Sequence, residues 1–365
     1  MRSGRTTSAF PPWVLGGASL LVLCSAAVLW AVSFQMFQVD SSNVEKVLWG
    51  SPNITWTLNP ELPNDNAFSA QGTVAARDDL ASAVSAAFDA WQSATYKNLQ
   101  VDGLLFTETS SDSQLAAPAA DCTNVVGFTG ALATGTIAQT VVTYVASDSA
   151  PFQYGAAASA LPCASGVVHT CPYRVCIADA DIEFNSAAQF ATYADAPMGQ
   201  YDLQSIATHE IGHLIGLDHS GIAHSVMYPY GDLTEAGVQR TLSVDDEIGA
   251  LVLYPNAASG ITALASEITG TVTVGGSAAF AVHLVALDPA SGNVVTDTLS
   301  EPSGTYHLRV FEGTYNVLAL PLAPDLNSGA YTIDNFNLFA CGYSTSSSAC
   351  VLPLNAFTNY TGQFY

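Results

Sequence analysis

The stretch HEIGHLIGLDHS, which begins at His209, concentrates side chains that bind metal ions and move protons. It holds three of the chain's seven histidines, with Glu210 directly after the first. On a helix, His209 and His213 lie about one turn apart on the same face, so both imidazoles can reach one ion. His219 can join them only if the chain turns back, and Gly216 stands where a left-handed helix end would make that turn.

Three neutral histidines leave a fourth position for water, which is the open geometry of catalytic zinc. Glu210 can then take a proton from that water without being a ligand itself. A single histidine on a helix is more often a core or surface residue than a ligand. However, chance fills all five fixed positions of HExxHxxGxxH only on the order of 10⁻⁵ times per sequence of this composition. The stretch therefore predicts zinc-dependent hydrolysis.

The composition is that of a globular, acidic protein of 365 residues. Hydrophobic residues make up 49%, and eight Lys and Arg stand against 31 Asp and Glu, which gives a formal net charge of −23. Such a charge repels nucleic acid phosphates, so a nucleic acid partner is excluded. A monomer is expected.

The N-terminus, residues 1–40, predicts export. After Arg2 and Arg5 no charged residue occurs before Asp40, and the apolar stretch from Trp13 to Phe34 is long enough to cross about 30 Å of hydrocarbon. It is either an uncleaved membrane anchor or a signal peptide cleaved after Ser33. Either interpretation places the rest of the chain outside the cytoplasm.

Six cysteines follow that segment, and an even number in an exported chain favours disulfides. Cys341 and Cys350 flank a short Ser-rich loop and are expected to pair. The other four allow three pairings, among which the sequence does not choose. A zinc cluster is the alternative, but the CxxC pairs typical of such clusters are absent. The four are Cys122, Cys163, Cys171 and Cys176.

Residues 41–257 are expected to form the domain that carries the histidines. Apolar periodicity predicts helices at Asp78–Ala94, Asp202–Leu214 and Ser243–Pro255, and strands within Ser51–Leu62 and Ile177–Asn185.

After these residues the pattern changes to short alternating strands with Asp-Pro, Ser-Gly and Glu-Gly turns. Residues 258–324 therefore predict a small all-β sandwich. Residues 325–365 predict a tail held by the Cys341–Cys350 loop.

The motif and its surroundings resemble the matrixin (matrix-metalloproteinase-like) family of metzincin zinc peptidases. Ser220 follows the third histidine as in matrixins. The sequence HSVMYPY, residues 224–230, resembles their Met-turn, with Met227 as the methionine beneath the zinc. Tyr228 and Pro229 continue this turn and are candidates for the rim of the substrate pocket. The cysteine-rich insertion before the motif suggests a bacterial relative.

The resemblance implies an α+β fold, in which a twisted mixed sheet carries three main helices. It also implies a peptidase that acts on proteins or peptides, with zinc held by His209, His213 and His219 and with Glu210 as general base. The family's inhibitory segment with its cysteine is absent. A second, structural zinc could use His169, and calcium could bind three acidic side chains, Asp148, Asp179 and Asp181.

The later strands resemble the carboxypeptidase-regulatory, transthyretin-like sandwich, with Gly-Thr-Tyr at residues 304–306 and 313–315. This part carries no catalytic constellation. It leaves open a second function, a surface binding or adhesion protein that retains the zinc site without turnover. A zinc hydrolase acting on a substrate other than peptide is a minor third alternative.

Overall fold

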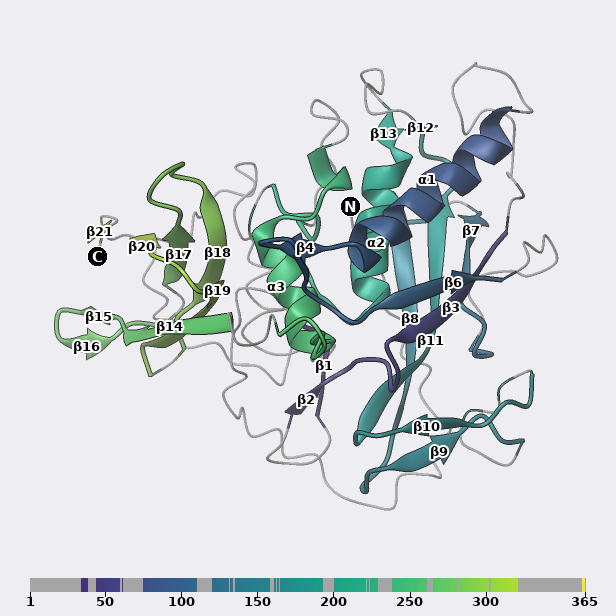
Figure 1. Cartoon of the computed structure of the whole chain (residues 1–365), viewed down its shortest axis with the longest axis horizontal. Coiled ribbons are helices and arrows are strands. Elements are labelled where there is room, and N and C mark those ends of the chain that lie inside the picture. The colour runs from purple at the N-terminus through teal and green to yellow at the C-terminus, as the bar shows by residue number, and fades with distance from the viewer. Residues whose placement is uncertain are drawn as a thin grey trace.

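The computed structural model of the chain describes residues 34–38, 44–59, 61, 75–109, 120–130, 132–133, 135–157, 161, 163, 165–192, 200–220, 222, 224–228, 238–260, 265–280, 282–301, 303–320 and 363–364. They form a larger α+β part and a smaller strand-rich part (Figure 1). In this described portion no helix is long and apolar enough to span a membrane. The predicted apolar segment, except for Phe34, and the Cys341–Cys350 loop lie outside the described residues.

A five-stranded sheet in the order β6-β3-β7-β11-β8 organises the larger part. The first four strands run parallel, and β8 at the edge runs antiparallel to β11. Every residue of β11 is buried, because helices cover one face and a disulfide-linked lobe packs near its first residues. The strands are β3 (Asn53–Leu58), β6 (Leu105–Glu108), β7 (Val125–Thr129), β8 (Ala138–Ala146) and β11 (Val175–Asn185).

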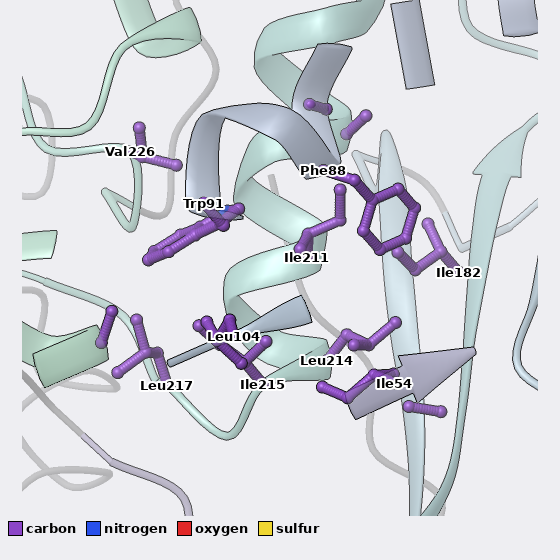
Figure 2. Close-up of a cluster of buried hydrophobic side chains, with 14 of the residues drawn as sticks. Ile54, Phe88, Trp91, Leu104, Ile182, Ile211, Leu214, Ile215, Leu217 and Val226 are labelled. Carbon is purple, nitrogen blue, oxygen red and sulfur yellow. The ribbon is translucent and has the colours of Figure 1, made fainter. Parts of the chain in front are cut away.

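Three helices accompany this sheet, as predicted: α1 (Ala75–Gln92), α2 (Leu203–Leu214) and α3 (Val244–Leu253). Figure 2 shows Phe88 of α1, Ile211 of α2 and Ile182 of β11 in one buried cluster. Burial of this apolar cluster stabilises the larger part, at about 25 cal/mol per Å² of apolar surface removed from water. The α+β architecture with a mixed sheet is confirmed.

Local sequence signals explain where α2 and α3 begin. The side chain of Asp202 caps α2 by accepting the amide of Ser205, and Arg240 holds the same carboxylate with two bonds of 2.6 and 2.7 Å. Ser243 and Asp246 form the reciprocal capping box of α3. Both caps occur at the predicted starts of these helices.

Two disulfides staple the loops beside the sheet and select one of the three pairings left open by the sequence. Cys122 bonds to Cys163, and Cys171 bonds to Cys176. The adjacent hairpin consists of β9 (Phe152–Tyr154) and β10 (His169–Cys171). Within it the ring of His169 stacks on Tyr154, and His169 belongs to no metal-ligand group among the described residues.

The strand-rich part contains small antiparallel sheets and its own cluster of buried hydrophobic residues, and its description as a sandwich stays a prediction. One sheet pairs β14 with β19, a second has the order β18-β17-β20-β21, and a third pairs β15 with β16. The strands are β14 (Ala265–Thr271), β17 (His283–Leu287), β18 (Val294–Leu299), β19 (Thr305–Phe311), β20 (Asn316–Leu320) and β21 (Gln363–Phe364).

Short elements complete the described fold. They are β1 (Met36–Gln38) with β2 (Val44–Lys46), β4 (Thr95–Tyr96) with β5 (Leu99–Gln100), β12 (Phe190–Ala191) with β13 (Tyr201–Asp202), β15 (Thr273–Val274) with β16 (Ser277–Ala278), and the 3₁₀ turn η1 (Val238–Arg240).

The two parts share buried contacts. Phe311, at the end of β19, belongs to the core of the larger part and stacks on Tyr96 with ring centroids 3.7 Å apart. The predicted domain limits at 257 and 324 remain predictions. Phe34 is buried against the larger part, so residues just before the predicted limit at 41 already contribute to it.

Candidate metal centre

The fold brings His209, His213 and His219 together. Their ligand atoms lie within 4.8 Å of one another, and all three side chains are buried. Nε2 of His209 lies 3.1 Å from Nε2 of His213. A tetrahedral zinc at about 2.0–2.1 Å from each nitrogen would separate two such atoms by about 3.3 Å. The spacing of the first two ligands therefore fits zinc.

The protonation of these rings also fits a cation. Nδ1 of His209 lies 2.7 Å from the carbonyl of Val226, and Nδ1 of His213 lies 3.0 Å from that of Leu217. A carbonyl only accepts, so each Nδ1 carries the proton and each Nε2 presents a lone pair. Burial, followed by the neighbouring His213 and His219, holds the pKa of His209 well below its ordinary value. Two lone pairs that face each other repel, and a cation between them removes that repulsion.

Gly216 makes the turn that returns His219 to the site. Its φ is +102°, and the amides of Gly216 and Leu217 donate to the carbonyls of His213 and Gly212 at 3.0 and 2.9 Å. This pair of backbone hydrogen bonds is the Schellman motif at the end of a helix. The predicted left-handed turn is thus present where the sequence places it.

Side chains from distant segments fix the last carbonyls of α2. Gln35 Nε2 donates to the carbonyl of His213 at 2.8 Å, and Trp49 Nε1 donates to that of Leu214 at 2.8 Å. Tyr254 Oη donates to the carbonyl of Ile215 at 2.7 Å. Carbonyls at a helix end lack partners within the helix, so these bonds replace water and hold the turn rigidly.

Glu210 points to β8, where Thr140 donates to its Oε2 at 2.7 Å. Burial raises the pKa of Glu210 to about 8, and the bond from Thr140 opposes this shift. No described residue hydrogen-bonds to Oε1, the other carboxyl oxygen, although it is fully buried. A buried carboxyl oxygen of this kind is available to a water molecule or a substrate.

Met227 lies directly under α2, in the turn after the third histidine. It is buried, and its sulfur would be 2.1 Å from a Cβ placed on Gly212. Asp246 holds this turn by accepting the amides of Val226 and Met227 at 2.9 and 3.1 Å. Tyr228 is buried rather than open to solvent, at 8% exposure, and Pro229 lies outside the described residues.

Several residues that support the site escape the sequence analysis. No local pattern connects Thr140, Gln35, Trp49 and Tyr254 with the histidines. Asp246 does have a signal, because its capping box with Ser243 is predictable. Its second role in holding the Met227 turn is not.

The three acidic candidates for calcium differ in burial. Asp179 and Asp181 are buried on β11, whereas Asp148 is exposed. Burial, then the charges of Asp181 and Asp121, raise the pKa of Asp179 to about 9, while backbone amides of the adjacent loop oppose this. Calcium binding stays a prediction.

This pKa predicts how stability depends on pH. The folded-state pKa of Asp179 exceeds the ordinary value, so the stability contributed by its proton is complete below about pH 4 and declines as pH rises towards 9. Asp179→Asn keeps the acceptor and removes the titration. At pH 8 without calcium, the variant should unfold at least about 2–4 °C above the native chain, corresponding to about 1 kcal/mol.

Thermal unfolding between pH 5 and 9 measures this effect, with Asp148→Asn as the exposed control. Equal slopes for the native chain and Asp179→Asn would contradict it. Calcium at pH 8 should stabilise the native chain and not Asp179→Asn if the ion binds here.

The segment that carries the histidines is similar to proteins of a known family. The Matrixin family of peptidases (M10) matches residues 164–255. Karilysin from Tannerella forsythia is 40% identical over 73 residues, which is 20% of this chain and 15% of karilysin. Metalloendoproteinase 1-MMP from Arabidopsis thaliana is 54% identical over 56 residues, 15% of each chain. Metalloendoproteinase 1 from Glycine max is 59% identical over 54 residues, 15% of this chain and 17% of that protein.

The chain thus spans about 15% of the length of the first two relatives. These relatives come from a bacterium and from a plant, so the bacterial affiliation stays a prediction, as does the resemblance of the strand-rich part. The matched segment holds the three histidines, Glu210 and Met227. Residues 164–255 of this chain are therefore similar to the matrixin metallopeptidases.

Proposed function

We propose that the chain is a zinc-dependent endopeptidase that hydrolyses peptide bonds outside the cytoplasm. The observation that carries the proposal is the meeting of three buried histidines beside the carboxyl group of Glu210. His209, His213 and His219 would hold the zinc. The match of residues 164–255 to matrixins, and the names of the related metalloendoproteinases, support a protein or peptide substrate.

When bound there, zinc would lower the pKa of a water ligand towards about 7 and polarise the carbonyl of the scissile bond. Glu210 takes a proton from the attacking water through Oε1 and passes it to the leaving amine. Thr140 fixes the other oxygen, so the carboxyl group keeps one orientation. Ser220 is not a nucleophile, because its hydroxyl is buried and donates to Asp245 at 2.8 Å.

Two disulfides support a location outside the cytoplasm, since such bonds persist in oxidising compartments. Attachment to a membrane through the N-terminal apolar segment, and a monomeric state, belong to the same proposal. Met227 would form the floor beneath the zinc, and Tyr228 and Pro229 would border the substrate.

The test measures bound zinc and cleavage of unfolded casein by the full chain. We expect about one zinc per chain as in catalytic sites of this ligand set. Cleavage should stop after treatment with a chelator and return on addition of zinc. A chain that binds zinc but leaves casein, gelatin and a mixed peptide library intact would favour the binding-protein alternative. A chain that binds no zinc would contradict the assignment of the three histidines.

A further inference from the structure

Helix α3 lies between α2, which carries His209 and His213, and the strand-rich part (Figure 1). Its first turn carries Asp245, whose two carboxyl oxygens face opposite sides of this boundary. Oδ2 accepts the hydroxyl of Ser220 at 2.8 Å, and Oδ1 accepts the hydroxyl of Thr296, on β18, at 3.0 Å. Exposed fractions are 2% for Ser220, 1% for Asp245 and 0% for Thr296, so water cannot substitute for either bond.

Ser220 connects this carboxyl group to the metal centre. It directly follows His219, and its amide donates to the carbonyl of Met227 at 2.8 Å. Its hydroxyl also accepts the amide of Ile222 at 3.2 Å. The position of Ser220 is therefore coupled to the third histidine and to the turn below the site.

Removing one hydrogen-bond partner of a buried carboxyl group lowers the free energy of unfolding by about 1–3 kcal/mol or more, because the group is left without a partner and without water. Burial and the nearby Asp297 and Asp246 raise the pKa of Asp245 well above its ordinary range, and the bonds from Ser220 and Thr296 oppose this shift. If Thr296 loses its hydroxyl, the carboxyl group must reorient towards another donor. That movement loosens its bond to Ser220.

We infer that Thr296 is a positioning residue for the metal centre: through Asp245 and Ser220, the strand-rich part holds His219 in place. This inference rests on the proposed zinc function. It assigns the strand-rich part a role in completing the metal site, beyond stability, spacing from a membrane or attachment to substrate. The two parts then act as one functional unit.

The test compares three full-length variants by their dissociation constants for zinc, measured in competition with a chromogenic chelator. Thr296→Val keeps the shape and removes the donor, and Thr296→Ser restores it. Tyr96→Leu removes the stack on Phe311 and so loosens a different contact between the two parts without touching Asp245. Melting temperature, kcat and KM are measured beside the zinc affinity.

Thr296→Val should weaken zinc binding about tenfold, the lower end of the effect of losing an outer hydrogen-bond partner of a ligand. It should lower kcat more than it changes KM. Thr296→Ser should bind zinc as the native chain does, and Tyr96→Leu should lose melting temperature but not zinc affinity.

Two results would overturn the inference but not the proposed function. One is native zinc affinity in Thr296→Val, and the other is a loss of zinc affinity in Tyr96→Leu equal to that in Thr296→Val. A native chain without zinc affinity would overturn the proposed function as well. Should Thr296→Val fold poorly, Ser220→Ala replaces it. In that case Ser220→Ala must weaken zinc binding about tenfold, and native zinc affinity in Ser220→Ala would overturn the inference.

Discussion

Replacing Glu210 with glutamine will abolish peptide cleavage and leave the zinc bound. The amide cannot accept the proton of the attacking water, so kcat should fall by about 10³-fold or more. Glutamine has the shape of glutamate, and its carbonyl oxygen can still accept the hydroxyl of Thr140. None of the three histidines is altered, so zinc affinity should remain.

Stability separates this loss from misfolding. Without zinc, burial raises the pKa of Glu210 to about 8, so the ionised form is disfavoured in the zinc-free folded chain. The neutral amide avoids that cost, so Glu210→Gln should melt at the native temperature or above.

Turnover of a fluorogenic peptide, zinc content and melting temperature are the three measurements. The matched control is Glu183→Gln. Glu183 is a second buried glutamate, and its carboxylate accepts a hydrogen bond from the side-chain amide of Gln139, on the neighbouring strand, at 2.5 Å. The control should keep activity within about threefold of the native chain, because it lies outside the metal centre. More than a tenth of native activity in Glu210→Gln would refute the role of Glu210 as general base.

Local spacing explains why so much of the metal centre was predictable. A spacing of four positions from His209 to His213 fixes their relation on any helix, and Gly216 encodes the turn that the third histidine needs. The capping residues Asp202 and Ser243 likewise mark helix starts through bonds to amides three residues away. Such information lies in a short window of sequence.

Contacts between distant residues carry no such signal. Thr140 lies 70 residues before Glu210, and Thr296 lies 51 residues after Asp245. Threonine and aspartate are common and usually solvated, so their type does not reveal a buried pair. The disulfide pairing between Cys122 and Cys163 was open for the same reason, because only the tertiary fold selects among the pairings.

Replacing Gly216 with alanine will remove the third ligand from the metal centre without changing any ligand. At φ +102° an L side chain is strained, and the new Cβ would lie 2.3 Å from the carbonyl oxygen of Val47. Both sides of this clash are backbone, so neither can rotate away. Gln35 ties the two segments together through its backbone. Its carbonyl accepts the amide of Val47, and its amide donates to the carbonyl of Gly216, each at 2.8 Å. The turn must therefore move, and His219 with it.

Zinc affinity should fall by about 100-fold or more, the upper end of what lost support of a ligand causes. The control is Gly135→Ala, since Gly135 also has a positive φ, +85°, but has nothing within 4 Å of the new Cβ. It should cost only conformational strain, about 1–2 kcal/mol of unfolding free energy, with native zinc affinity. Chelator competition and thermal unfolding of both variants separate strain from ligand placement. If the two variants lose equal stability and neither loses zinc affinity, then contacts other than the Gly216 turn position His219.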